Sequence, residues 1–183
     1  MSFAPEGEAD TEAVTILRRL RSSAKARDGA PVAPKATRVC FSYKSVRGVP
    51  PPHVSAAKQQ LEDLGYRVKW GLDVSRTAAD WRNVWMRWCE EADFVVNFLS
   101  VDYVKKGTGE ACADEWCIGQ KKKRPEQLIN LVIGGRDARK AIENLPAAGL
   151  ADGASQIQIY LAKGGQATSL SGPPPRIFTL EHG

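Results

Sequence analysis

Residues 92–117 read ADFVVNFLSVDYVKKGTGEACADEWC, and this stretch decides the fold. It begins with the apolar run 94–99, which is too short to span a membrane and suits a strand that is buried on both faces. A polar loop containing glycine follows, and a helical segment begins near residue 110. A buried strand that leads through such a loop into a helix N-terminus is where an open α/β protein holds its chemistry.

Strand-like and helical segments alternate on either side of this stretch. Five segments are predicted to be strands: 37–43, 66–72, 94–99, 128–133 and 157–161. Helical spacing and cap signals predict helices between them, at 54–64, 81–92, 111–122 and 137–144. This alternation predicts a parallel sheet with helices on both faces. Because 66–72 and 157–161 alternate apolar and polar residues, they belong at the edges. We therefore expect an α/β, flavodoxin-like three-layer fold whose five-stranded parallel sheet has the order 2-1-3-4-5.

The same order of elements divides the chain into three parts. Residues 1–36 are expected to form an N-terminal helix and an Ala/Pro linker, because a narrow apolar stripe precedes several arginines and prolines. Residues 37–163 form the predicted domain. Residues 164–183, which contain three consecutive prolines, are expected to be a tail.

Composition narrows the class of protein. The chain has 183 residues, 43% of them hydrophobic and 26% charged, which is typical of one soluble globular domain with tails. Its net charge of +5 comes largely from the run 121–124, which we interpret as a solvated helix end, so nucleic acid is not an expected partner. The four cysteines and two histidines lack zinc-ligand spacing, so no metal site is predicted. With no signal peptide and no membrane-length apolar run, we expect a cytoplasmic protein.

The expected strand order places a ligand crevice between the carboxyl ends of the first and third strands. We expect this crevice to offer five cations, Lys44, Arg47, Arg76, Lys105 and Lys106, together with the carboxylate of Glu115 near a helix N-terminus. No acidic cluster, P-loop or GxGxxG follows any strand. Cations around one acid suit an anionic ligand whose reacting part becomes positive, such as a nucleotide ribosyl group. The alternative is that these are ordinary surface lysines and a glutamate that complements the helix dipole.

Two other patterns have a structural and a functional interpretation. The tryptophans at 81, 85 and 88 have helical spacing and are expected to face the core, although such a stripe can also stack on a nucleobase. Cys112 at a helix start, with His53 on another loop, is compatible with a cysteine nucleophile. The free use of cysteine elsewhere in the chain favours a structural role instead.

Four pieces of this sequence, in order, resemble Toll/interleukin-1 receptor (TIR) domains. Phe41-Ser42-Tyr43 resembles the first box, and 65–68 followed by Asp73 and a polar loop resembles the second box and its BB loop. Residues 92–103 resemble the third strand with the serine and tyrosine that follow it. Residues 112–116, Cys-Ala-Asp-Glu-Trp, resemble the start of the next helix.

The resemblance implies a flavodoxin-like domain that cleaves NAD at the nicotinamide N-glycosidic bond, releasing nicotinamide and either ADP-ribose or a cyclic isomer. NAD is then the substrate and no cofactor is needed. The aligned catalytic residue is Glu115, and the implied substrate-binding residues are Ser42, Tyr43, Lys44, Arg47, Tyr103, Cys112 and Trp116. The implied partners are other TIR domains, in a homo-oligomer that forms on activation in innate immune signalling. The implied BB-loop contacts are Asp73, Ser75, Arg76 and Trp81. The alternative within the family is a scaffold that binds other TIR domains and catalyses nothing.

The chain departs from the family pattern beside Glu115. Plant-type members carry Ser-x-Trp before the cysteine, where this chain has Gly109-Glu110-Ala111. Two alternatives follow: the aromatic floor for the ligand is missing, or Tyr103 or Trp116 supplies it. Glu110 adds a second carboxylate, which is expected to raise the pKa of Glu115 or to share its work.

Overall fold

The computed structural model describes residues 14–20, 37–73, 80–165 and 167–170. Four parallel strands lie in the order β2-β1-β3-β4. They are β1 (Arg38–Tyr43), β2 (Arg67–Lys69), β3 (Phe94–Leu99) and β4 (Leu128–Ile133). These four predicted strands and their order are confirmed, and the arrangement is consistent with a flavodoxin-like fold.

The predicted fifth strand, 157–161, is wrong. It lies inside the helix α7 (Ala154–Ala162), whose residues Ala154, Ile157 and Leu161 face the core. Positions 157 and 161 are four residues apart, so they fit a helix as well as an alternating strand, and the length of the segment could not distinguish them. Beyond β4, the sheet continues instead with β5 (Ala167–Leu170), which pairs in parallel with it. This strand lies in the segment that the sequence predicted as a tail.

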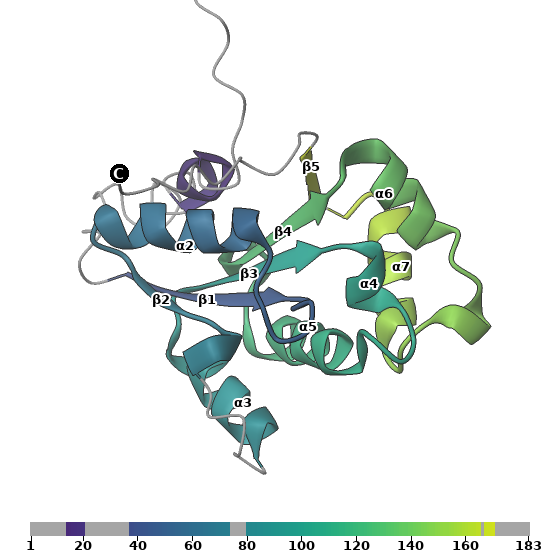
Figure 1. Cartoon of the computed structure of the whole chain (residues 1–183), viewed down its shortest axis with the longest axis horizontal. Coiled ribbons are helices and arrows are strands. Elements are labelled where there is room, and N and C mark those ends of the chain that lie inside the picture. The colour runs from purple at the N-terminus through teal and green to yellow at the C-terminus, as the bar shows by residue number, and fades with distance from the viewer. Residues whose placement is uncertain (1–13, 21–36, 74–79, 166, 171–183) are drawn as a thin grey trace, which may run out of the picture.

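Helices cover both faces of the sheet, as Figure 1 shows. The helix α2 (Pro52–Asp63) and the helical residues 14–20 lie on one face, and α3 (Trp81–Glu91) and α5 (Glu110–Lys122) lie on the other. The remaining elements are α4 (Val101–Val104), α6 (Gly135–Glu143), η2 (Gly71–Asp73), η3 (Pro125–Gln127) and η4 (Ala147–Gly149). No helix in the described ranges has both the length and the apolarity that a membrane crossing requires.

The N-terminal helical segment belongs to the same core as the sheet. Ile16 and Leu20 are buried in the cluster that β1, β3, β4 and α2 form on one face. Residues of β1 alternate between the two faces, so Phe41 and Tyr43 join this cluster while Cys40 packs on the α3 side. Ser42 consequently faces the same side as Cys40, toward α5.

Three buried polar residues lie at one level of the sheet on the α5 side. The parallel register pairs Ser42 with Asn97, and Asn97 with Asn130. Asn97 Nδ2 donates to Asn130 Oδ1 at 2.8 Å, and Asn130 Nδ2 donates to the Tyr160 hydroxyl at 3.2 Å. The sheet therefore presents a polar row, Ser42–Asn97–Asn130, beneath the helices that cover this face.

Candidate active site

Glu115 lies within the stripe of α5 that faces the sheet. The buried residues of this helix are Cys112, Ala113, Trp116 and Gly119, a spacing of i, i+1, i+4 and i+7. Glu115 is three residues after Cys112, so it is a charged residue at the border of a core stripe. A Cβ at Gly119 would make only ordinary van der Waals contacts with Leu128 and Val95, at 3.7 and 3.8 Å, so this position does not require glycine. The Glu115 carboxylate is directed toward β1, where it accepts a hydrogen bond from Ser42.

A hydrogen-bonded chain holds this carboxylate. Ser42 Oγ donates to Glu115 Oε2 at 2.6 Å, and the same Oγ lies 2.5 Å from the Tyr103 hydroxyl oxygen. Ser42 and Tyr103 are fully buried, at 0% exposure. A serine hydroxyl has one proton and can donate one hydrogen bond. When Glu115 is ionised, Ser42 donates that hydrogen bond to the carboxylate, so Tyr103 must be the donor in its hydrogen bond with Ser42. The described part of the chain provides Glu115 Oε1 with no hydrogen-bond partner.

Local contacts fix the position of Tyr103. Ser100 caps the short helix α4, because its Oγ accepts a hydrogen bond from the Tyr103 backbone N–H at 3.2 Å. The loop after α4 brings Gly109 against the backbone of Tyr103. A Cβ at position 109 would lie only 2.3 Å from the Tyr103 carbonyl oxygen. Only glycine fits at position 109 without moving the backbone.

The helix α3 fixes the other side of Glu115. The Trp85 ring nitrogen donates to the Glu115 carbonyl oxygen at 3.3 Å. Arg82 forms an ion pair with Asp114, the residue before Glu115. A backbone contact and a side-chain pair therefore fix the segment of α5 that carries the carboxylate.

The environment of Glu115 changes its acidity. Burial raises the pKa of Glu115 to about 8, the hydrogen bond from Ser42 opposes this rise, and the negative charge of Asp114 adds to it. Glu115 is therefore largely protonated at neutral pH in the free protein. A carboxyl group whose pKa is near the working pH of a cell is a candidate for acid–base or electrostatic catalysis.

Glu110 does not share this site. Its side chain turns back to accept a hydrogen bond from the Gly107 backbone N–H, and that bond lowers the pKa of Glu110. Glu110 is also the acidic residue of the first turn of α5, where it complements the helix dipole, whereas Glu115 lies in the second turn. The expectation that Glu110 raises the pKa of Glu115 is wrong, because the neighbouring charge that does so is Asp114.

No family model, curated protein or solved structure matches this chain.

The aromatic and cysteine residues predicted to bind substrate lie in the core. Tyr103 and Trp116 are 0% and 3% exposed, and the Trp116 ring packs edge-on against Tyr160 at 5.8 Å. Neither ring offers a face to a ligand in this structure. Cys112 donates to the Tyr43 carbonyl oxygen at 3.6 Å, and burial raises the pKa of its thiol well above the usual range. Tyr103 instead supports Glu115 through Ser42.

Among the residues that the structure describes, no histidine lies beside Cys112, the alternative nucleophile. His53 begins α2 and lies 6.3 Å from the Phe98 ring, on the face of the sheet opposite α5. Cys112 packs on the α5 side. The sequence left open a pairing of the two residues, and the structure places them on different faces of the sheet.

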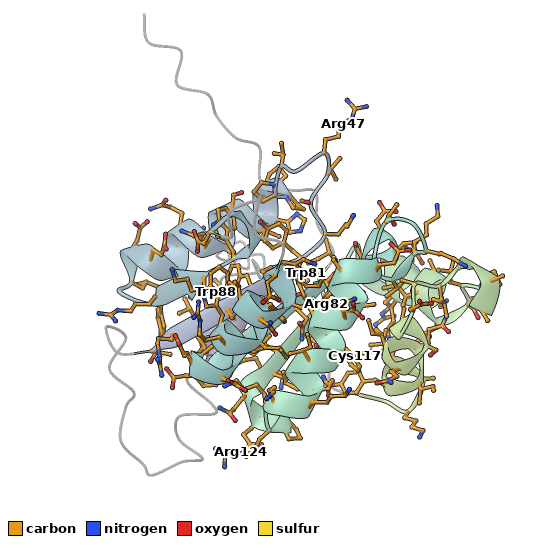
Figure 2. The ribbon with its side chains drawn as sticks, turned by 90° about the horizontal axis from the view of Figure 1, so that it is seen from below. Arg47, Trp81, Arg82, Trp88, Cys117 and Arg124 are labelled. Carbon is orange, nitrogen blue, oxygen red and sulfur yellow. The ribbon has the colours of Figure 1, made fainter. Side chains whose placement is uncertain are left out.

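The loop after β1 extends away from Glu115. Val46 and Val49 exchange two backbone hydrogen bonds of 2.9 Å, which closes a tight hairpin with Arg47 and Gly48 at its tip. Arg47 has a φ of 52° and is exposed, and Figure 2 shows its side chain pointing away from the molecule. Arg47 therefore does not lie beside the carboxylate.

A small hollow occupies the crevice that the strand order predicted. It measures about 40 Å³ and lies at the carboxyl ends of β1, β3 and β4. Tyr43 and Lys44 line it together with His53, Phe98 and Ser100, on the α2 side of the sheet. A volume near that of one water molecule does not hold a nucleotide, whose sites measure roughly 300–1,000 Å³. Tyr43 thus lines the crevice from the face opposite Ser42, whereas the positive charge of Lys44 also acts on Glu110 and Cys112 of α5.

Of the four predicted interface residues, the structure describes Asp73, which ends η2, and Trp81, which begins α3. Asp73 is exposed and accepts a hydrogen bond from the Trp70 backbone N–H at 3.2 Å. Ser75 and Arg76 lie outside the described residues. Trp81 is half-buried beneath the Arg82 guanidinium, 5.5 Å from its ring centre, and Figure 2 shows both on the same outer surface. Trp85 is the tryptophan of this helix that the core buries.

Proposed function

We propose that this chain is a TIR-like domain that cleaves NAD at the bond between nicotinamide and ribose, with Glu115 as the catalytic carboxylate. The observation that carries the proposal is the carboxylate itself: one oxygen is held by Ser42, the other has no partner among the described residues, and its pKa is about 8. Three of the four TIR-like motifs each contribute one residue to this hydrogen-bonded group. Ser42 comes from the first motif, Tyr103 from the third and Glu115 from the fourth.

The chemistry needs one carboxylate and no general acid. When the bond between the ribose C1′ and the nicotinamide nitrogen breaks, its electron pair stays on nicotinamide, which leaves as a neutral molecule. The ribosyl group becomes an oxocarbenium-like cation, which a nearby carboxylate stabilises. Water then adds to C1′ and loses a proton. The balance is NAD⁺ and water giving nicotinamide, ADP-ribose and H⁺.

The raised pKa of Glu115 suits this substrate. The nicotinamide ring of NAD carries a positive charge, and a positive charge beside a carboxyl group favours its ionised form. Substrate binding would therefore help to ionise Glu115, and Ser42 is already placed as a donor to the charged form. The carboxylate would be generated next to the group that it stabilises.

The experiment is to incubate the concentrated protein with NAD and to measure released nicotinamide by chromatography. Glu115→Gln and Glu115→Ala should abolish release while circular dichroism shows the fold intact. Glu110→Gln is the matched control, since it neutralises a carboxylate five positions earlier on the same helix that faces its own loop. Normal release by Glu115→Ala would contradict the proposal, as would a wild-type protein that leaves NAD intact.

A non-catalytic binding module is the second candidate, and the surface of α3 favours it. Two tryptophans there lie under cations: Arg82 over Trp81 at 5.5 Å and Lys69 over Trp88 at 5.4 Å. Partly exposed aromatic rings with cationic neighbours are enriched at protein interfaces. This candidate predicts concentration-dependent self-association that Trp81→Ala weakens, with no NAD cleavage. Sedimentation velocity over a range of protein concentrations measures it.

A further inference from the structure

The hydroxyl of Tyr103 is buried where no ligand reaches it, yet it ends in a hydrogen bond that leads to Glu115. Tyr103 is 0% exposed, and its hydroxyl oxygen lies 2.5 Å from Ser42 Oγ. The described residues provide this hydroxyl with no partner other than Ser42. The Tyr103 hydroxyl therefore makes one hydrogen bond, to Ser42, and Ser42 in turn contacts the Glu115 carboxylate.

In the ionised state of Glu115, the state in which it would stabilise a cation, the direction of the hydrogen bonds from Tyr103 through Ser42 follows from proton counting. An ionised carboxylate only accepts, so the single proton of Ser42 points to Glu115 Oε2. Ser42 Oγ must then accept from Tyr103, which leaves the hydroxyl of Ser42 with one orientation. A buried serine without Tyr103 could turn its proton toward other acceptors. Chains of this kind also strengthen each bond by polarisation.

We propose that Tyr103 is a positioning residue, which acts through Ser42 to hold the Glu115 carboxylate in one orientation with Oε1 open to the substrate. The consequence for NAD cleavage rests on the function proposed above, whereas the hydrogen bonds from Tyr103 through Ser42 to Glu115 are independent of that function. Tyr103 touches neither substrate nor reacting atoms in this arrangement. Its effect passes through a single serine hydroxyl.

The other ionisable groups around Glu115 come from each element packed against it. Asp114 precedes it on α5 and is paired with Arg82 of α3. Cys112 of α5, Cys40 of β1 and Cys89 of α3 also interact electrostatically with it. Burial raises the pKa of each of these thiols, so they remain neutral over the pH range of the test. The variants below leave all these groups unchanged.

The test is to titrate Glu115 directly in the full chain by carbon-13 NMR of labelled glutamate, with its signal identified by its loss in Glu115→Gln. Ser42→Ala removes a hydrogen bond to a charged group and should raise the pKa of Glu115 by about 1. Tyr103→Phe should raise it by a smaller amount, about 0.3, because it removes only the polarising donor. Tyr160→Phe is the control, because it removes a partly buried tyrosine hydroxyl that accepts a hydrogen bond from Asn130 on the same face of the sheet.

A second probe keeps the shape of the core. Incorporating 3-fluorotyrosine at position 103 makes the phenol a stronger donor, so the pKa of Glu115 should fall, opposite in sign to Tyr103→Phe. This probe also covers the case in which Tyr103→Phe does not fold. Equal titration of Glu115 in the wild type and in the fluorinated protein would overturn the proposal, and so would a Tyr103→Phe effect no larger than that of Tyr160→Phe.

Kinetics separate this proposal from the proposed function. If NAD is cleaved, Tyr103→Phe should lower kcat and leave KM unchanged, because a buried hydroxyl has no contact with substrate. If NAD is not cleaved but the titration shifts occur, the proposed function is wrong and the positioning role of Tyr103 is supported. If NAD is cleaved and Glu115 titrates alike in all variants, the positioning role of Tyr103 is wrong and the proposed function is supported.

Discussion

Replacing Glu115 with glutamine should make the fold more stable, by an amount that increases with pH. Burial raises the pKa of Glu115 from 4.5 to about 8. Between these values the folded chain keeps a proton that the unfolded chain has released, so stability falls as pH rises through this range. Glutamine keeps the shape of the side chain and can still accept the hydrogen bond from Ser42, but it has no charge to bury.

The size of the effect follows from the same two values. One pKa unit corresponds to about 1.36 kcal/mol, so ionising Glu115 in the folded state costs at most about 5 kcal/mol. From pH 5 to pH 8, the free energy of unfolding of the wild type should fall relative to Glu115→Gln by on the order of 3 kcal/mol. Above pH 8 the difference should level off, because the carboxyl group is then ionised in both the folded and the unfolded state.

Urea unfolding at pH 5, 6, 7 and 8, followed by tryptophan fluorescence, measures this difference. The buried residues Trp85 and Trp116 should report loss of the core. Glu91→Gln, at the exposed end of α3, is a control whose difference from the wild type should stay flat with pH. A difference for Glu115→Gln that does not change with pH would refute the reasoning, because it would mean that Glu115 ionises equally easily in both states.

Four further predictions come from the surroundings of Glu115. If the ionised carboxylate stabilises the transition state, kcat/KM for NAD should rise about tenfold per pH unit below pH 8 and level off above it; a flat profile from pH 6 to 9 would contradict this. Asp114→Asn removes a negative charge beside Glu115 and should move the midpoint of that pH profile to lower pH. Arg82→Ala leaves the charge of Asp114 unpaired and should move the midpoint to higher pH. Shifts of the same sign in both variants would contradict this electrostatic explanation. Iodoacetamide at pH 8 should leave Cys112 unmodified in the folded protein and should label it after unfolding, because the thiol is buried. Peptide mass spectrometry measures the labelling, and rapid labelling of the folded protein would contradict the burial of Cys112. Gly109→Ala should cost about 1–3 kcal/mol in urea unfolding, because its Cβ would collide with the Tyr103 carbonyl, and an unchanged midpoint would show that the loop can yield.

The sequence predicted the strands that periodicity and composition define without ambiguity. The runs 94–99 and 128–133 are continuously apolar and match β3 and β4. The segment 66–72 was predicted too long, because η2 begins at Gly71 and β2 comprises only Arg67–Lys69. The four-residue β5 was missed, since Ala-Thr-Ser-Leu has too few apolar residues to indicate a strand.

The candidate site was predicted in part. The strand order correctly brought the ends of β1 and β3 together and placed Glu115 beside them. Motif position alone could not show that Ser42 and Tyr43 face opposite sides of the sheet, although the period of two in a strand contains that information. Nor could it show that Glu110 folds back onto Gly107, because that contact depends on the local course of the loop.

The polar row Ser42–Asn97–Asn130 links the register of the sheet to the hydrogen bond that holds Glu115. If β3 slipped by one residue against β4, Asn97 and Asn130 would face opposite sides of the sheet and lose their hydrogen bond, and a buried amide left alone is costly. The same slip between β1 and β3 would change how Ser42, and with it the support of Glu115, lies relative to Tyr103, which follows β3. A chain that pairs its strands in the wrong register would therefore lose both this buried hydrogen bond and the support of Glu115 at the same time.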